Sequence, residues 1–391
     1  ARVIGVDEAH KVLPNEIFAK YFDDFGRRIR KYRGIPVLIT QSLEDFFINR
    51  FGVRLYQTFF KDYTEKVWGV SCSEISAEWG AQRIKGLSIT KTILDILQKP
   101  FRKKDINQKK TETSLIEYFL YPKYGPGQLW TKVAELIEEK GGILYKNAKV
   151  VQLNGTNELT SALIETGKEK IQSTITFDYC ISTMSVKDLF NAFSFTIPSD
   201  IKNISDNLVY RDFITVGILL DKTKIELNDN WIYIQENYVK VGRIQVFNNW
   251  SPFLVKESDT IWLGLEYFCN ENDVLWQLNK KELIAQATQE LIQLGFIDSS
   301  KNVLDATVIK VPKTYPAYFG TYSEFYKIRN FVDVIPNLFL VGRNGMHKYN
   351  NQDHSMLTAM QAVQNIKNGI LSKENIWSIN TEEEYHEEKK Q

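Results

Sequence analysis

Hydrophobic and polar positions follow two different periods along this chain. Between Leu208 and Phe268 they alternate every second residue, and the apolar positions are rich in aromatic and β-branched side chains. This alternation predicts an antiparallel sheet. A period near 3.6 residues predicts helices over residues 42–97, 129–140 and 280–294. We therefore expect helices and an antiparallel sheet in separate stretches of the chain.

Shorter strands are predicted before this sheet. Gly141 and Gly142 end the helix at 129–140, as glycines commonly do. The predicted strands are residues 143–153, interpreted as two strands, then 162–165, 171–177 and the apolar run that ends at Met184. The apolar face of the helix is expected to contain Leu129, Val133, Leu136 and Ile137.

The stretch VGRNGMHKYNNQDHSMLTAM predicts a strand end, a polar loop and a helix. The apolar run 338–341 precedes the loop, and the helix is expected to begin near Asp353 or Ser355. The N–H groups and the positive dipole end of a helix start suit a phosphate or another electron-rich group. Gly342 and Gly345 would let such a ligand approach the backbone. From the pattern alone, a plain helix cap with a surface loop is the favoured alternative, because the three-glycine dinucleotide fingerprint is absent. The apolar helix face is expected to contain Met356, Leu357, Met360 and Val363.

Composition narrows the function classes. The 391 residues suffice for roughly two or three domains, and 43% hydrophobic residues predict a sizeable core. A net charge of +1 argues against a nucleic-acid-binding protein, whose affinity rests on a basic surface. Cys72, Cys180 and Cys269 are far apart, which fits a reducing compartment and provides no zinc or disulfide framework. No run reaches the roughly 20 apolar residues that span a bilayer. We expect a cytoplasmic protein, for which peripheral membrane contact stays open.

Residues 1–41 carry a pattern of their own. The strand RVIGV ends in Asp7 and Glu8, a helix with a basic second half follows, and the strand IPVLITQ comes last. The acidic strand end, the RKY helix and the TQS strand end resemble, in this order, the C-terminal ATPase core of type IV secretion and conjugation motors. The chain has no GxxxxGKS or GxxxxGKT loop, so ATP hydrolysis is not expected.

One group of flavoproteins contains, in the same order and at the same intervals, the stretches YTEKVWGVSCSEISAEWGAQRIKGLSI, YPKYGPGQLW and NLFLVGRNGMHKYNNQDHSM. On this basis residues 42–370 resemble the FAD-dependent amine-oxidoreductase superfamily, in the branch of UDP-galactopyranose mutase and protoporphyrinogen-oxidase-like proteins. The resemblance implies an α/β (α+β) fold with an incomplete FAD-binding Rossmann-like domain, an antiparallel-sheet substrate domain and a helical insertion. The expected domains are a motor-ATPase-like fragment (1–41), a helical substrate or lid region (42–120), two parts of an FAD-binding domain (121–195 and 311–372), the substrate domain (196–310) and a tail (373–391).

The resemblance also assigns residues to the cofactor FAD. Gly342 and Arg343 would lie beside its diphosphate. The following helix start would lie beside the flavin ring and ribityl chain, where its positive end can stabilise the negative charge of reduced flavin. For the strand residues, ordinary sheet core is the alternative. The expected cofactor-binding residues are Val150 and Val151 at the adenine end, Ser182 and Thr183 where backbone runs close to the cofactor, Gly342, Arg343, Asn351, Gln352, Asp353, His354, Ser355 and Met356.

A nucleotide sugar, or a related substrate of surface polysaccharide biosynthesis, is the ligand that the resemblance implies. In a mutase of this type flavin N5 attacks the anomeric carbon, and in an oxidase N5 accepts a hydride, so flavin is expected to carry the chemistry. Cations suit a nucleotide diphosphate, and aromatic faces suit a base or a sugar ring. No metal site is expected, because the two histidines of this segment lack a third partner. The expected substrate-binding residues are Trp68, Arg83 and Lys85 (for which a solvated helix face is the alternative), Tyr315, Tyr318, His347, Lys348 and Tyr349.

The GxGxxG unit that opens the fold in this superfamily is absent from the sequence. That unit cradles the pyrophosphate, so we expect impaired FAD binding. Three explanations stay open: a truncated or chimeric chain in which a motor fragment replaces the unit, a non-catalytic remnant, and a substitute strand-helix-strand layer formed by residues 1–41. The sequence does not define an oligomeric state.

Overall fold

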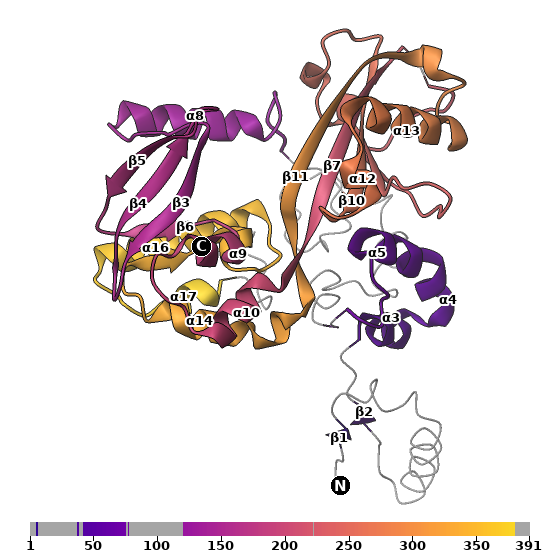
Figure 1. The fold of residues 1–391 in the computed structure, drawn as a ribbon. Coiled ribbons are helices and arrows are strands. Elements are labelled where there is room, and N and C mark those ends of the chain that lie inside the picture. The colour runs from indigo at the N-terminus through magenta and orange to yellow at the C-terminus, as the bar shows by residue number, and fades with distance from the viewer. Residues whose placement is uncertain are drawn as a thin grey trace, which may run out of the picture. The chain divides into compact units, whose positions relative to one another are not determined.

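The computed structural model describes residues 42–75, 77, 120–221 and 223–379, together with the backbone of two short strands near the N-terminus. The chain forms two compact units (Figure 1), residues 1–119 with 235–237, and residues 120–234 with 238–391. Arg83, Lys85, most of the motor-like segment and the residues after 379 lie outside the described residues. In the described ranges no helix is long and apolar enough to cross a membrane.

The first unit contains a group of short helices. Ser42 caps the helix Leu43–Phe51, because its hydroxyl accepts a hydrogen bond from the Asp45 N–H at 3.2 Å. The buried Phe47 stacks on the partly buried Phe60, with ring centroids 4.6 Å apart. The elements are β1 (Gly5–Val6) and β2 (Val37–Leu38), which pair in parallel, α3 (Leu43–Phe51), α4 (Val53–Leu55), the π-helix η1 (Tyr56–Phe60) and α5 (Lys61–Trp68).

The helical stretch predicted over residues 42–97 is present as four short helical segments up to Trp68, with an interruption at Gly69, and residues 78–97 lie outside the described residues. Gly69 follows Trp68 with a φ of 70°, and turns occupy residues 72–74. A left-handed residue cannot continue an α-helix, so the periodic sequence signal is interrupted at this glycine.

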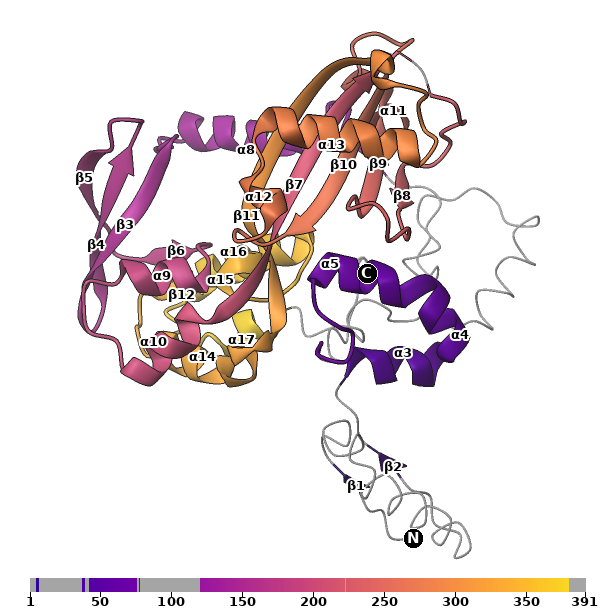
Figure 2. The ribbon, with the colours of Figure 1, turned by 45° about the vertical axis from the view of Figure 1, so that its right-hand side comes forward.

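The second unit contains a five-stranded antiparallel sheet in the order β11-β7-β10-β9-β8, which confirms the sheet predicted from the alternating stretch. Helix α13 (Lys280–Gln293) lies against one face (Figure 2), where Leu283, Ala287 and Leu291 pack on apolar strand residues. The strands are β7 (Leu208–Leu220), β8 (Trp231–Tyr233), β9 (Arg243–Val246), β10 (Ile261–Cys269) and β11 (Val303–Gly320). The shorter helical segments are α11 (Phe247–Trp250), η4 (Pro252–Leu254), α12 (Val274–Gln277), η5 (Ser300–Asn302) and η6 (Thr321–Glu324).

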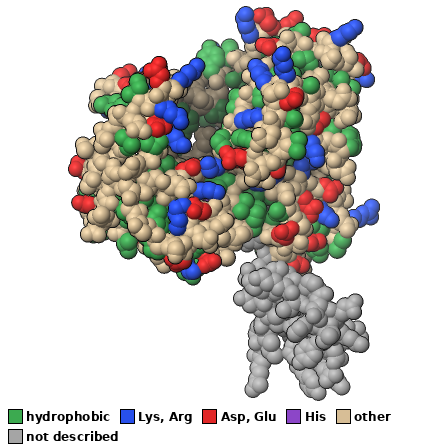
Figure 3. All heavy atoms as spheres, in the orientation of Figure 1, with side chains coloured by type: hydrophobic (Ala, Val, Ile, Leu, Met, Phe, Trp, Pro, Cys, Tyr) green, Lys and Arg blue, Asp and Glu red, His purple; other side chains and the backbone are tan. Residues whose placement is uncertain are grey.

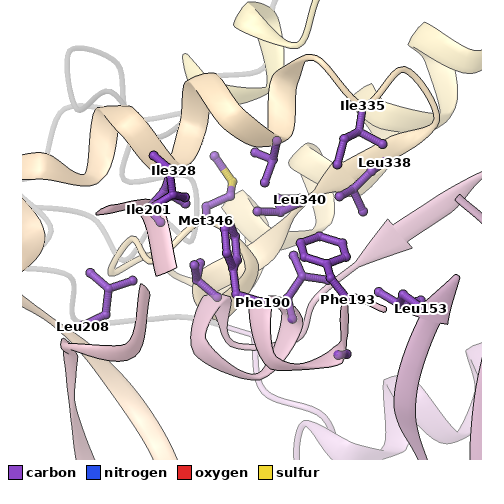
Figure 4. Packing of buried hydrophobic residues seen from close by; sticks show 14 of the residues in the cluster. Leu153, Phe190, Phe193, Ile201, Leu208, Ile328, Ile335, Leu338, Leu340 and Met346 are labelled. Atoms are coloured by element: carbon purple, nitrogen blue, oxygen red, sulfur yellow. The ribbon is translucent and has the colours of Figure 1, made fainter. Parts of the chain in front are cut away.

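The rest of the second unit surrounds another core. A three-stranded antiparallel sheet and a parallel strand pair contribute to it with several helices. Phe190, Phe193, Leu338, Leu340 and Met346 converge in this core (Figure 4). The elements are α8 (Gly127–Glu139), β3 (Ala148–Gly155), β4 (Leu159–Thr166), β5 (Ile171–Thr176), β6 (Cys180–Ser182), α9 (Val186–Ala192), α10 (Ser199–Asp206), α14 (Phe325–Asp333), β12 (Leu338–Leu340), α15 (Gly342–Gly345), α16 (Gln352–Lys367) and α17 (Glu374–Trp377). The predicted mixed α/β fold class is confirmed.

Residues 143–153 contain part of one strand, β3, rather than the two strands that the sequence suggested. A turn at residues 146–147 precedes β3, and Asn147 has a φ of 54°. Asparagine tolerates this left-handed conformation better than most residues. The polar turn therefore starts the strand five residues later than expected.

The apolar faces of two helices are solvent-exposed. Helix α8 has no buried residue, and Leu129, Leu136 and Ile137 are each more than two fifths exposed. In α16, Met360 is 64% exposed, whereas Ala362 is buried against Phe339 of β12. Three residues of the predicted apolar face, Met356, Met360 and Val363, are exposed, and α16 is buried instead through Thr358, Ala362 and Asn365. Hydrophobic side chains, drawn in green, are visible at several places on the face shown in Figure 3.

Candidate cofactor and substrate site

The candidate site lies where two parallel strands end. β12 and β6 pair with Leu340 opposite Ser182, and the N–H of Val341 donates to the Ser182 carbonyl at 3.0 Å. The carboxyl ends of parallel strands form one edge of a sheet, which is the usual ligand-binding edge in open α/β folds. The chain leaves this edge through Gly342.

Two glycines bring the loop after β12 against the end of β6. Gly342 has a φ of 74°, and a Cβ placed there would lie 3.8 Å from Ser355 Oγ and 3.9 Å from Thr183 Cγ2. A Cβ on Gly345 would lie only 2.6 Å from the Ser182 carbonyl oxygen. The structure therefore brings together Ser182, Thr183, Gly342 and Ser355, which the sequence had assigned to one site. Ligand contact by these residues stays a prediction.

Helix α16 begins beside this loop. Its N-cap residue, Asn351, makes no side-chain capping bond, so the cap side chain leaves the first-turn N–H groups uncovered. Asn351, Gln352, Asp353 and Met356 are exposed, and His354 is partly buried. The 16-residue helix directs its positive dipole end toward this position.

Three buried polar atoms in the loop have no hydrogen-bond partner among the described residues: Asn344 Oδ1, His347 Nδ1 and Asn350 Nδ2. The other end of the Asn350 amide is engaged, because its Oδ1 accepts from Ser355 Oγ at 3.0 Å. Buried polar atoms are nearly always paired in folded proteins. The loop therefore has spare donor and acceptor capacity, which fits a ligand edge with both nitrogen and oxygen atoms, such as that of a flavin ring.

Arg343 is held by backbone carbonyls. Its Nε and Nη2 donate to the Asn350 carbonyl at 3.1 and 2.6 Å, and its Nη1 donates to the Thr314 carbonyl at 3.4 Å. The guanidinium carbon lies 4.6 Å from the ring centroid of Tyr349 and 5.4 Å from that of Tyr315. These partners are uncharged, so the contacts orient the cation without neutralising it. Its positive charge remains for an anionic ligand group.

Tyr315 and Tyr349 form a parallel pair, with ring centroids 5.7 Å apart and 9° between the ring planes. Both rings are partly buried, and burial raises the pKa of the Tyr315 hydroxyl. The Tyr315 hydroxyl accepts a hydrogen bond from Arg243 Nη2 at 3.1 Å. The tyrosine pair thus connects the loop cation to a second cation on the five-stranded sheet. Lys348 is also partly buried within the same loop.

Arg243, Gln245 and Glu266 were not identified from the sequence. Arg243 and Glu266 occupy paired positions on β9 and β10, and Arg243 Nε lies 2.5 Å from Glu266 Oε2. The Gln245 amide also donates to Glu266. Burial raises the pKa of Glu266, while Arg243 opposes the shift by stabilising the carboxylate. The available sequence signal was the polar alternation in RIQV, which places Arg243 and Gln245 on one sheet face.

Three of the predicted substrate contacts are buried side chains. Trp68 is 2% exposed inside the helical unit, Tyr318 is 3% exposed, and His347 is fully buried. The His347 ring instead packs edge-on against Tyr210 at 4.7 Å, and its Nε2 bonds to the Ala317 carbonyl at 3.1 Å. Burial lowers the pKa of His347 to about 4. These side chains pack inside the protein, and their contact with a substrate stays a prediction.

The residues predicted to contact adenine lie in the three-stranded sheet. Val150 and Val151 lie in β3 and are partly buried, and Val150 packs on the core beside the parallel strands. Their proposed adenine contact stays a prediction. In the described ranges, no group of three His, Cys, Asp or Glu side chains could hold a metal ion.

Several solved protein structures share this fold. No protein-family model matches the chain. A crystal structure of reduced UDP-galactopyranose mutase superposes with a TM-score of 0.69 at 18% sequence identity, covering 89% of this chain and 72% of the mutase. A protein from Exiguobacterium sp. 255-15 assigned as a protoporphyrinogen oxidase gives a TM-score of 0.56 at 12% identity, covering 83% of this chain and 67% of that protein. A Pyrococcus furiosus protein gives 0.51 at 10% identity, with the same coverage. The chain therefore shares the fold of UDP-galactopyranose mutase and protoporphyrinogen-oxidase-like oxidoreductases.

Proposed function

We propose that this protein is an FAD-dependent flavoprotein of the oxidoreductase or mutase type, acting on a nucleotide sugar or a related substrate in surface polysaccharide biosynthesis. The observation that carries the proposal is the convergence of Gly342, Ser182 and the start of α16 around a loop with unpartnered buried amide atoms. The shared fold supports the same conclusion. When bound, FAD supplies the chemistry through N5, either as a nucleophile or as a hydride acceptor.

On the cofactor side, the protein's role is to bind and orient. The backbone at Gly342 and Gly345 gives close access, and the positive end of α16 favours negative charge at the adjoining edge of the ligand. Asn350 Nδ2 provides a buried donor at the same place. Val150, Val151, Ser182 and Thr183 belong to the proposed cofactor-binding surface as well.

On the substrate side, two guanidinium groups flank the tyrosine pair. Arg343 lies over Tyr349, and Arg243 donates to the Tyr315 hydroxyl. Cations beside aromatic hydroxyls suit a diphosphate, because charge-assisted hydrogen bonds are stronger and shorter than neutral ones. Glu266 and Gln245 hold Arg243 in place. A nucleoside diphosphate is therefore the ligand class that we assign to this surface.

Flavin retention tests the proposal. The purified chain is incubated with excess FAD, desalted and scanned for visible flavin absorbance. We expect flavin to be retained, with an affinity reduced by the missing GxGxxG unit, and retention to be weaker still in Asn350→Ala, which removes the unpartnered donor. Asn368→Ala is the matched control, because Asn368 lies at the opposite end of α16. Equal retention in the two variants would contradict the assignment of the helix start.

A flavin-free remnant is the second candidate. The exposed apolar faces of α8 and α16 favour it, because monomeric proteins rarely expose extended apolar patches. It predicts folded protein with no flavin absorbance after incubation with FAD, and a tendency to aggregate. The same absorbance scan therefore decides between the two candidates.

A further inference from the structure

Tyr318 lies near the end of β11 and is only 3% exposed. Its ring stacks on Tyr322, with centroids 4.6 Å apart and 13° between the ring planes. A ring this deeply buried offers little surface for direct contact with a substrate. A contribution of Tyr318 to ligand binding therefore has to pass through a neighbouring residue.

That neighbour is Tyr349. The backbone N–H of Tyr349 donates to the Tyr318 hydroxyl at 2.6 Å. One residue earlier on β11, the Ala317 carbonyl bonds to His347 Nε2 at 3.1 Å. Ala317 and Tyr318, which are consecutive in β11, thus hold His347 and Tyr349 of the loop. His347 itself has a φ of 45°, which a non-glycine residue keeps only where the surroundings fix it.

Hydrogen bonds hold the backbone on both sides of the Tyr349 side chain. The N–H of Tyr349 is held by Tyr318, and the carbonyl of the next residue, Asn350, accepts two bonds from Arg343. Backbone fixed on both sides leaves the ring parallel to Tyr315 and beneath the Arg343 guanidinium. The hydroxyl of Tyr315 is fixed in turn by Arg243.

We propose that Tyr318 is a positioning residue, whose buried hydroxyl orients the Tyr349 backbone so that the Tyr315–Tyr349 pair and Arg343 present one preorganised surface to a nucleoside diphosphate. This inference rests on the proposed function for its ligand class. The hydrogen bond from Tyr349 to Tyr318 is independent of that class. Preorganisation increases affinity because less side-chain and loop freedom is lost on binding.

Tyr318→Phe tests the proposal, because it removes the hydroxyl and keeps the stacked ring. Tyr326→Phe makes the same chemical change on an exposed ring and is the matched control. UDP binding is measured by calorimetry on the full chain after incubation with FAD. We expect the Kd for UDP to rise about fivefold to thirtyfold in Tyr318→Phe, as for the loss of one or two ordinary hydrogen bonds. Tyr326→Phe should bind UDP as the wild type does.

A double-mutant cycle separates positioning from general loss of structure. In a Tyr349→Ala background, Tyr318→Phe should cause no further loss of UDP affinity, because the residue that it positions is gone. Two independent, additive losses would overturn the proposal. Retained flavin absorbance in each variant shows that the cofactor side is intact.

Hydrogen exchange tests the inference without any ligand or variant. The amide of Tyr349 should be protected in the wild type and should exchange at least about tenfold faster in Tyr318→Phe. An unprotected Tyr349 amide in the wild type would overturn the proposal, even if the variant fails to fold. If wild-type protein does not bind UDP although this amide is protected, the nucleoside diphosphate is the wrong ligand class. The orienting bond then stands and the proposed function does not.

Discussion

Arg243 and Glu266 form a buried ion pair across two neighbouring strands of the five-stranded sheet. Their side chains are 9% and 3% exposed, and Arg243 Nε lies 2.5 Å from Glu266 Oε2. The pair sits on the sheet face opposite α13, because Ile244 and Leu265, the alternate residues of the same strands, pack in the core beneath that helix. Burying two charges is costly unless they are paired and further hydrogen-bonded, and here Gln245 and Tyr315 complete the network.

Removal of one member of this pair should destabilise the protein. In Glu266→Gln the buried Arg243 charge loses its counter-ion, so we expect the free energy of unfolding to fall by about 3 kcal/mol. Urea unfolding followed by far-UV circular dichroism measures the change. The control Glu135→Gln disrupts the exposed pair of Lys132 and Glu135 and should have no measurable effect. A loss in Glu266→Gln no larger than that in the control would contradict the role of the pair.

Gly345→Ala should weaken both stability and flavin retention. Its added Cβ would lie 2.6 Å from the Ser182 carbonyl oxygen, and this backbone can relieve the contact only by moving. We expect a loss of about 1–3 kcal/mol in the free energy of unfolding, with less flavin retained after desalting. Gly127→Ala is the control, because no atom lies within 4 Å of a Cβ at that position. Unchanged stability and flavin retention in Gly345→Ala would show that the loop does not need this close approach.

Burial of His347 predicts acid sensitivity. Its pKa is lowered from 6.5 to about 4 in the folded state, so between these values the unfolded chain binds a proton that the folded protein does not. The free energy of unfolding should therefore fall as pH decreases from 6.5 to 4, with a share of about 3 kcal/mol from this residue. Urea unfolding across that range tests the effect. His347→Gln should flatten the dependence, whereas His354→Gln should leave it in place; equal slopes in the two variants would exclude His347 as the source.

Burial of Lys373 predicts that the stability of the protein depends on pH in the alkaline range. Its Nζ donates to the carbonyls of Val332 at 3.0 Å and Ile335 at 2.7 Å, at the end of α14. Burial lowers its pKa from 10.5 to about 8. Between these values the unfolded chain retains a proton that the folded protein has released, so stability should rise with pH across this window. Thermal unfolding of the wild type and Lys373→Met measures this, and a wild-type curve that is flat or falls would contradict the prediction.

Local pattern was sufficient for most of the secondary structure. The alternation from Leu208 to Phe268 corresponds to strands of the five-stranded sheet, and the period over 280–294 corresponds to α13. The strand-loop-helix unit around Gly342 also has its predicted order. These features depend on the spacing of residues that are close together in the sequence.

Contacts between distant segments could not be predicted in the same way. Helix α16 is buried through Thr358, Ala362 and Asn365, and Ala362 packs on Phe339 of β12. His347 carries a polar ring into the core, where a neighbouring strand supplies a carbonyl. Neither outcome follows from the hydrophobicity of the segment itself, since each depends on the shape of its packing partner.

By itself, the sequence determined the fold class, the order of the elements and the glycine-rich loop before a helix, because periodicity, glycine placement and helix signals are local properties. Only the tertiary structure decided which polar side chains meet. The register of β9 on β10 sets Arg243 beside Glu266, and the approach of β11 to the loop sets Tyr318 against Tyr349. Such pairs arise from strand register and packing, which act between residues far apart in the chain.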